Sequence, residues 1–212
     1  MNRTTTPQYF QAIAWGLMSL VCLLAILAWG RDYAWHLTPI NAYQYFPLFG
    51  LLAFSLMWTH YAFGAIKRSA HLPDSALANY FEATSLAVLV LICLHPGLLI
   101  YQRYKDGYGL PPHSYETYVS HGLGWLTILG TISLFIFLAF EFRRRFSDRE
   151  WWAYVLVAND LAMLAIFYHS LRLGSQIHGW FRTVWWFYGL SLIACLIYKY
   201  VEQATPDKES RA

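Results

Sequence analysis

The chain has 212 residues, of which 58% are hydrophobic, 19% aromatic and only 13% charged. Soluble domains carry about 25% charged residues, so this composition argues against a soluble enzyme and indicates a chain embedded in a lipid bilayer. The formal net charge of +3 is a signal of membrane topology here, and we expect no nucleic-acid partner.

Six apolar runs follow one another along the chain, joined by short polar connections. They are Gln11–Gly30, Tyr45–Ile66, Tyr80–Gln102, Tyr118–Phe142, Trp151–Leu173 and Thr183–Tyr200. A helix needs about 20 mostly apolar residues to cross the hydrocarbon core. We therefore expect an all-α integral membrane protein with six transmembrane helices in one bundle. It would comprise an N-terminal segment (1–10), a transmembrane domain (11–200) and a charged tail (201–212).

The distribution of basic residues predicts the orientation of this bundle. Ten of the 15 Lys and Arg residues fall on the side that holds both termini, and five fall on the other. By the positive-inside rule, both termini should be cytoplasmic. The first run is not followed by a small-residue cleavage site, so we expect it to be a retained anchor. These signals favour a multi-pass protein of the bacterial inner membrane.

Two histidines lie inside apolar runs at similar depth. His95 is 15 residues after Tyr80 and His169 is 18 residues after Trp151, about 22 and 27 Å along a helix axis. Both runs go from the cytoplasm outward, so both rings should lie in the outer half of the bilayer. Facing imidazoles on bundle helices can form the axial ligands of one b-type haem. The alternative is two structural histidines that hydrogen-bond to neighbouring helices.

Basic residues near the same face fit such a cofactor. Arg172 lies one turn beyond His169, and Arg103 follows His95 toward the outer surface. Both are candidate partners for haem propionates, although long basic side chains also extend to the interface without any ligand. His121 opens the fourth run on the same side. It is an alternative ligand, either distal or in a non-haem metal site with His95 and His169.

Asn159 and Asp160 fall in the middle of the fifth run. A carboxylate at this depth is costly unless it is paired, protonated or hydrated. The two side chains are therefore candidates for carrying protons or for hydrogen-bonding a membrane quinol. The alternative is a protonated carboxyl group that bonds across helices and has only a structural role.

Six spans with histidines on the third and fifth resemble the ferric-reductase-like transmembrane domain. The resemblance implies a b-type cytochrome in which His95 and His169 form the outer ligand pair. The family has a second, inner pair, and the corresponding positions here hold no haem ligand: Phe81, Glu82, Val155 and Leu156. The resemblance therefore implies one haem and not two.

We thus expect a cytochrome that passes electrons between a membrane quinol or partner redox subunit and an acceptor on the outer face, as an oxidoreductase subunit. The chain has no G-x-G-x-x-G motif and no length for a flavin or nicotinamide domain. Two alternatives stay open. One is a haem-free membrane scaffold or complex subunit of the same fold, and the other is a non-haem metal-binding membrane protein.

Overall fold

A computed structural model describes residues 6–36 and 41–205, and the chain is all-helical there. The helical segments are α1 (Thr6–Asp32), α2 (Ala42–Ser69), η1 (Asp74–Leu77), α3 (Ala78–Lys105), α4 (His113–Glu116), α5 (Gly124–Phe140), α6 (Arg143–Phe146), α7 (Trp152–Leu173) and α8 (Gly179–Ala204). Within the described ranges, five of them (α1, α2, α3 with η1, α7 and α8) are long and apolar enough to cross a membrane. This agrees with the expected multi-pass membrane protein.

The fourth apolar run forms a shorter helix than expected. The run 118–142 is helical only over α5, which has 17 residues. At 1.5 Å per residue α5 is about 25 Å long, less than the hydrocarbon thickness of about 30 Å. The preceding residues form turns, and Gly122 has a φ of +85°, which glycine adopts without strain. The expected boundaries also shift, since α1 begins at Thr6 and α8 ends at Ala204; 1–5 and 206–212 lie outside the described residues.

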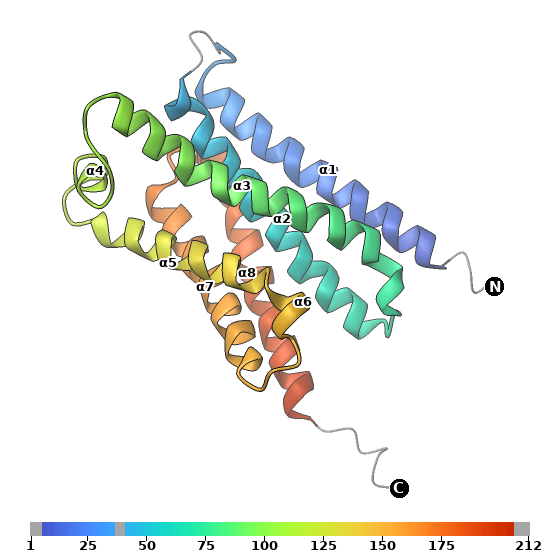
Figure 1. Ribbon diagram of the computed structural model, residues 1–212. Helices are drawn as coiled ribbons and strands as arrows, with labels where there is room; N and C mark the ends of the chain where they lie inside the picture. The colour runs from blue at the N-terminus through green and yellow to red at the C-terminus, as the bar shows by residue number, and fades with distance from the viewer. Residues whose placement is uncertain (1–5, 37–40, 206–212) are drawn as a thin grey trace, which may run out of the picture.

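The long helices alternate in direction and form two groups (Figure 1). In one, α1 and α3 both pack on α2, and in the other α5 packs on α7; α8 packs against α2 and joins the groups. The connections between α1 and α2, α3 and α5, and α7 and α8 define what we call the α4 end. The connections between α2 and α3 and between α5 and α7, with the first and last described residues, define the α6 end.

Aromatic residues fill the seam between α2 and α8. The Phe54 and Trp185 ring centroids are 4.6 Å apart, and Trp58 stacks on Tyr188 at 4.4 Å. The indole Nε1 of Trp58 also donates to the Ser191 hydroxyl at 2.8 Å. A polar indole group in the apolar seam is thereby satisfied, as buried polar groups must be.

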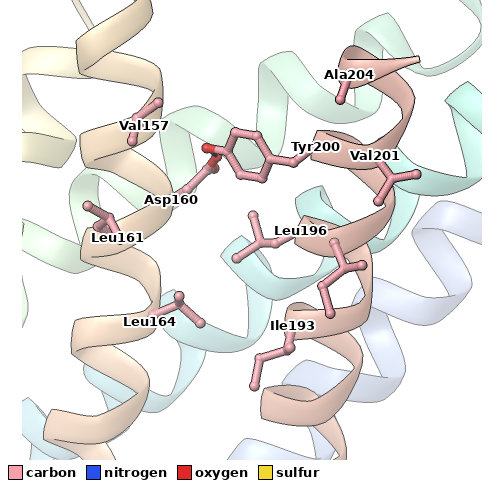
Figure 2. Close-up of a pocket in the computed structure, with 10 residues that line it drawn as sticks. Val157, Asp160, Leu161, Leu164, Ile193, Leu196, Tyr200, Val201 and Ala204 are labelled. Carbon is pink, nitrogen blue, oxygen red and sulfur yellow. Dashed lines mark hydrogen bonds between the residues drawn. The ribbon is translucent and has the colours of Figure 1, made fainter.

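Helices α7 and α8 pack closely at Gly189 and leave a groove toward the α6 end. The Phe167 ring lies over Gly189, so that a Cβ built on this glycine would be 2.1 Å from Phe167 Cζ. Toward the α6 end a groove of about 600 Å³ lies between the two helices. Figure 2 shows this groove, with Tyr200 of α8 extending across it to Asp160 of α7.

Candidate functional site

His95 lies against α2 through a hydrogen bond and a glycine. Its Nδ1 is 2.7 Å from the backbone carbonyl oxygen of Phe46. A Cβ built on Gly50, one turn further along α2, would be 2.8 Å from both Cε1 and Nδ1 of the ring. The imidazole therefore occupies the space that any other residue at position 50 would need.

His169 has the same arrangement on the other pair of helices. Its Nδ1 is 2.8 Å from the carbonyl oxygen of Leu126 on α5. A Cβ built on Gly130 would be 2.9 Å from its Cε1. In both cases the glycine comes four residues after the accepting carbonyl, so each ring lies in an equivalent notch on its neighbouring helix.

These bonds define the tautomer of both rings. A carbonyl oxygen only accepts, so Nδ1 of each neutral imidazole carries the hydrogen and Nε2 keeps a free lone pair. Among the described residues, no hydrogen-bond partner reaches Nε2 of either His95 or His169. Each predicted histidine thus keeps one ring nitrogen that could act as a ligand.

Arg103 is buried beneath the loop at the α4 end and does not extend into solvent. Its guanidinium donates to the Thr117 hydroxyl and its Cζ lies 3.5 Å from the ring centroid of Tyr108. Only 5% of the residue is exposed, and no described residue provides a hydrogen-bond acceptor for its Nε. A buried charged group with an unmet donor is costly, so this position favours an anionic partner.

Aromatic rings connect this arginine to the histidine pair. The Arg103 Cζ lies 5.6 Å from the Tyr118 ring centroid. Tyr118 contacts Phe46 at 6.0 Å, and Phe46 contacts His95 at 5.4 Å between centroids. The unmet Arg103 donor and the His95 ring are therefore connected through Tyr118 and Phe46.

The two other residues that were predicted to contact the cofactor are exposed and not buried in the bundle. Arg172 is exposed at the end of α7, and His121 is exposed in the turn before α5. No group of three His, Cys, Asp or Glu side chains within the described ranges is arranged to hold a metal ion. The structure therefore does not gather His95, His121 and His169 into a three-ligand metal site.

Asp160 is the centre of a polar cluster that links three helices. Its Oδ2 accepts from Lys199 Nζ at 2.5 Å and from the Tyr200 hydroxyl at 2.7 Å. Its Oδ1 accepts from the Tyr61 hydroxyl at 3.0 Å, and Asn159 Nδ2 donates to that same hydroxyl at 3.1 Å. Asp160 is 5% exposed. The carboxylate is thus paired with a cation, Lys199, and pairing is one of the conditions that make a buried carboxylate tolerable.

A second cavity, of about 250 Å³, lies inside the bundle among α2, α3, α5, α7 and α8. Asp160 and Lys199 line it, and so does His60, whose Nε2 is 2.7 Å from the Thr84 hydroxyl. Leu156 also lines it. Leu156, one of the positions where the resemblance would place an inner ligand, thus forms part of the apolar wall of this cavity.

Five contributing residues were not singled out in the sequence: Gly50, Gly130, Tyr61, Lys199 and Tyr200. A glycine in an apolar run does not show which aromatic side chain will pack against it. The two notches therefore could not be predicted without knowing which helices pair. Lys199 did carry a signal, because it lies within the last turns of the sixth run. It was interpreted only as a basic residue near the membrane surface.

Comparison with known proteins adds no further assignment, because no protein-family model, curated protein sequence or solved structure matches the chain.

Proposed function

We propose that this chain is a membrane-integral b-type cytochrome that holds one haem between His95 and His169. In this proposal α5 is the sixth membrane helix, both termini are cytoplasmic, and the α4 end faces outward from a bacterial inner membrane. The protein passes electrons between a membrane quinol or a partner subunit and an acceptor on the outer face, as an oxidoreductase subunit.

The observation that carries the proposal is the matched pair of histidine notches. Metal-bound histidines commonly donate their second ring N–H to a carbonyl or carboxylate, which sets the tautomer and the ring orientation. His95 and His169 both do this, toward Phe46 and Leu126. The second ring nitrogen, Nε2, has no hydrogen-bond partner among the described residues and is therefore available to a metal ion.

The arginines support an orientation with propionates toward the α4 end. The buried Nε of Arg103 lacks an acceptor among the described residues, and a propionate carboxylate would provide one. Arg172, exposed one turn beyond His169, would provide a second cation. A bound haem supplies a one-electron iron couple. The chain itself supplies the two ring nitrogens, their fixed orientation and the apolar seam beside them.

The decisive experiment is the absorption spectrum of the full chain, purified in detergent from haem-replete cells. We expect Soret and α bands of a bis-histidine b-type haem, at one haem per chain by the pyridine haemochrome assay. His95→Ala and His169→Ala should each abolish or strongly change these bands.

His60→Ala is the matched control, because His60 is also partly buried and hydrogen-bonded inside the bundle but lies toward the α6 end. It should retain the spectrum. A folded, inserted wild-type chain without haem would refute the cytochrome proposal. That result would favour the haem-free scaffold, and a stable partner recovered with the chain would then support a subunit role.

A further inference from the structure

The groove between α7 and α8 has an apolar wall and a single polar feature. Its lining is formed by aliphatic side chains, Tyr200 and the carboxylate of Asp160. In Figure 2 the Tyr200 hydroxyl meets Asp160, while Leu161, Leu164 and Ile193 extend the apolar wall away from that point. A volume of about 600 Å³ is typical of sites that hold a small organic ligand.

The polar cluster has hydrogen-bonding capacity that its internal bonds do not use. The Lys199 ammonium has three N–H donors and gives one to Asp160 Oδ2. Tyr200 gives its single hydrogen to the same oxygen, which leaves the phenolic oxygen able to accept. Tyr200 lines the groove and can accept from a ligand hydroxyl there, whereas Lys199 lines the cavity inside the bundle, on the other side of Asp160.

The net charge of the cluster formed by Asp160, Lys199 and Tyr200 determines which kind of membrane-dissolved ligand fits it. Asp160 and Lys199 form an ion pair at 2.5 Å, so together they carry no net charge. A phosphate headgroup would need an unpaired cation, and an ammonium headgroup would need an unpaired carboxylate. Asp160 also lies eight residues after Trp152, about 12 Å into the helix, which is deeper than the layer where charged headgroups stay hydrated. A neutral headgroup with hydrogen-bonding oxygens fits both conditions.

We infer that this groove binds a membrane quinone or its quinol, with one ring oxygen at Tyr200 and Asp160 and the tail along α7 and α8. The inference locates the quinol of the proposed function, but binding here does not require haem. Asp160 also lines the cavity inside the bundle, so the headgroup would lie between the lipid phase and this inner cavity.

The test is equilibrium binding of decylubiquinone to the full chain in detergent, by isothermal titration calorimetry. We expect saturable binding by the wild-type chain. Ile197→Trp fills the groove from a position that is 60% exposed, and we expect about tenfold weaker binding. Leu190→Trp is the matched control: it is on α8, 63% exposed and outside the groove lining, and should bind as the wild type does. Tyr200→Phe should weaken binding about fivefold through the lost hydroxyl.

The same titration on the His169→Ala chain separates this inference from the haem proposal. Retained quinone binding there, with or without haem in the wild type, supports the groove as an independent site. Binding that is unaffected by Ile197→Trp would overturn the inference, as would no saturable binding by the wild type. Displacement of the quinone by dioleoyl phosphatidylglycerol at equal concentration would identify a phospholipid as the occupant and would also overturn it.

Discussion

Replacing Gly50 with alanine tests whether a helix notch holds the proposed ligand in place. The new Cβ would be 2.8 Å from Cε1 and Nδ1 of His95, whereas non-bonded carbons prefer about 3.5–4.0 Å. The ring must retreat by about 0.7 Å or more. Such a shift lengthens the Nδ1–Phe46 bond from 2.7 Å to about 3.4 Å, beyond the ordinary hydrogen-bond range.

Loss of a hydrogen bond to a ligating histidine lowers metal affinity by about 10–100-fold. We therefore expect Gly50→Ala to release haem about 10–100 times faster than the wild-type chain. The assay follows the Soret band during transfer of haem to excess apomyoglobin.

Gly97→Ala is the control for helix propensity. Gly97 lies on α3, two residues after His95, with no atom within 4 Å of a built Cβ. Both substitutions favour the helix by about 1 kcal/mol, so a difference between them reports the steric effect alone. Equal haem release by the two variants would refute the notch as a positioning device, because the ring would then not depend on the space above Gly50.

Three further predictions concern packing and titration. Lys199→Met leaves the Asp160 carboxylate buried without its cation and should destabilise the chain by about 3–5 kcal/mol, measured by SDS-induced unfolding; an equally stable variant would show that Asp160 is already protonated. Gly189→Ala places a Cβ 2.1 Å from Phe167 and should cost about 1–3 kcal/mol in the same assay; an equally stable variant would contradict the close packing of α7 on α8. Burial raises the pKa of Tyr115 above 10.0. The buried neutral phenol therefore makes its full contribution to the free energy of unfolding below pH 10, and this contribution is lost as the pH rises through the raised pKa. Tyr115→Phe should therefore lose less stability than the wild-type chain above pH 10, and parallel alkaline melting curves would contradict this.

The sequence allowed the helical character of the chain to be predicted, because it depends on local composition and spacing. Apolar run lengths predict six spanning helices, and five helices within the described residues are long enough to span. Counting along two parallel runs places His95 and His169 at one level, which stays a prediction. The length of α5 was overestimated, because Tyr118 and Val119 are apolar but precede Gly122, whose left-handed backbone separates them from the helix. Hydropathy cannot register such a break, since it measures composition and not backbone conformation.

The partners of the polar residues could not be predicted in the same way. Asp160 and Lys199 are 39 residues apart on different helices, and their pairing depends on the rotation of α7 against α8. Arg103 was expected near a surface, but its burial depends on a loop that folds back over it. Side-chain chemistry limited the possible partners of Asp160 and Arg103, but helix rotation and loop conformation determined which partners they have.

The two histidine notches also have a consequence for assembly. Each notch is formed within one antiparallel hairpin, α2 with α3 or α5 with α7, whose strong contacts are local in sequence. A cofactor held by both rings would need the two hairpins to come together around α8. A cofactor bound by both histidines would therefore link the two hairpins. Its binding free energy would add to the stability of their association. Haem loading would be a late step in biogenesis, and a substitution at the α2–α8 seam would reduce it without altering either ligand.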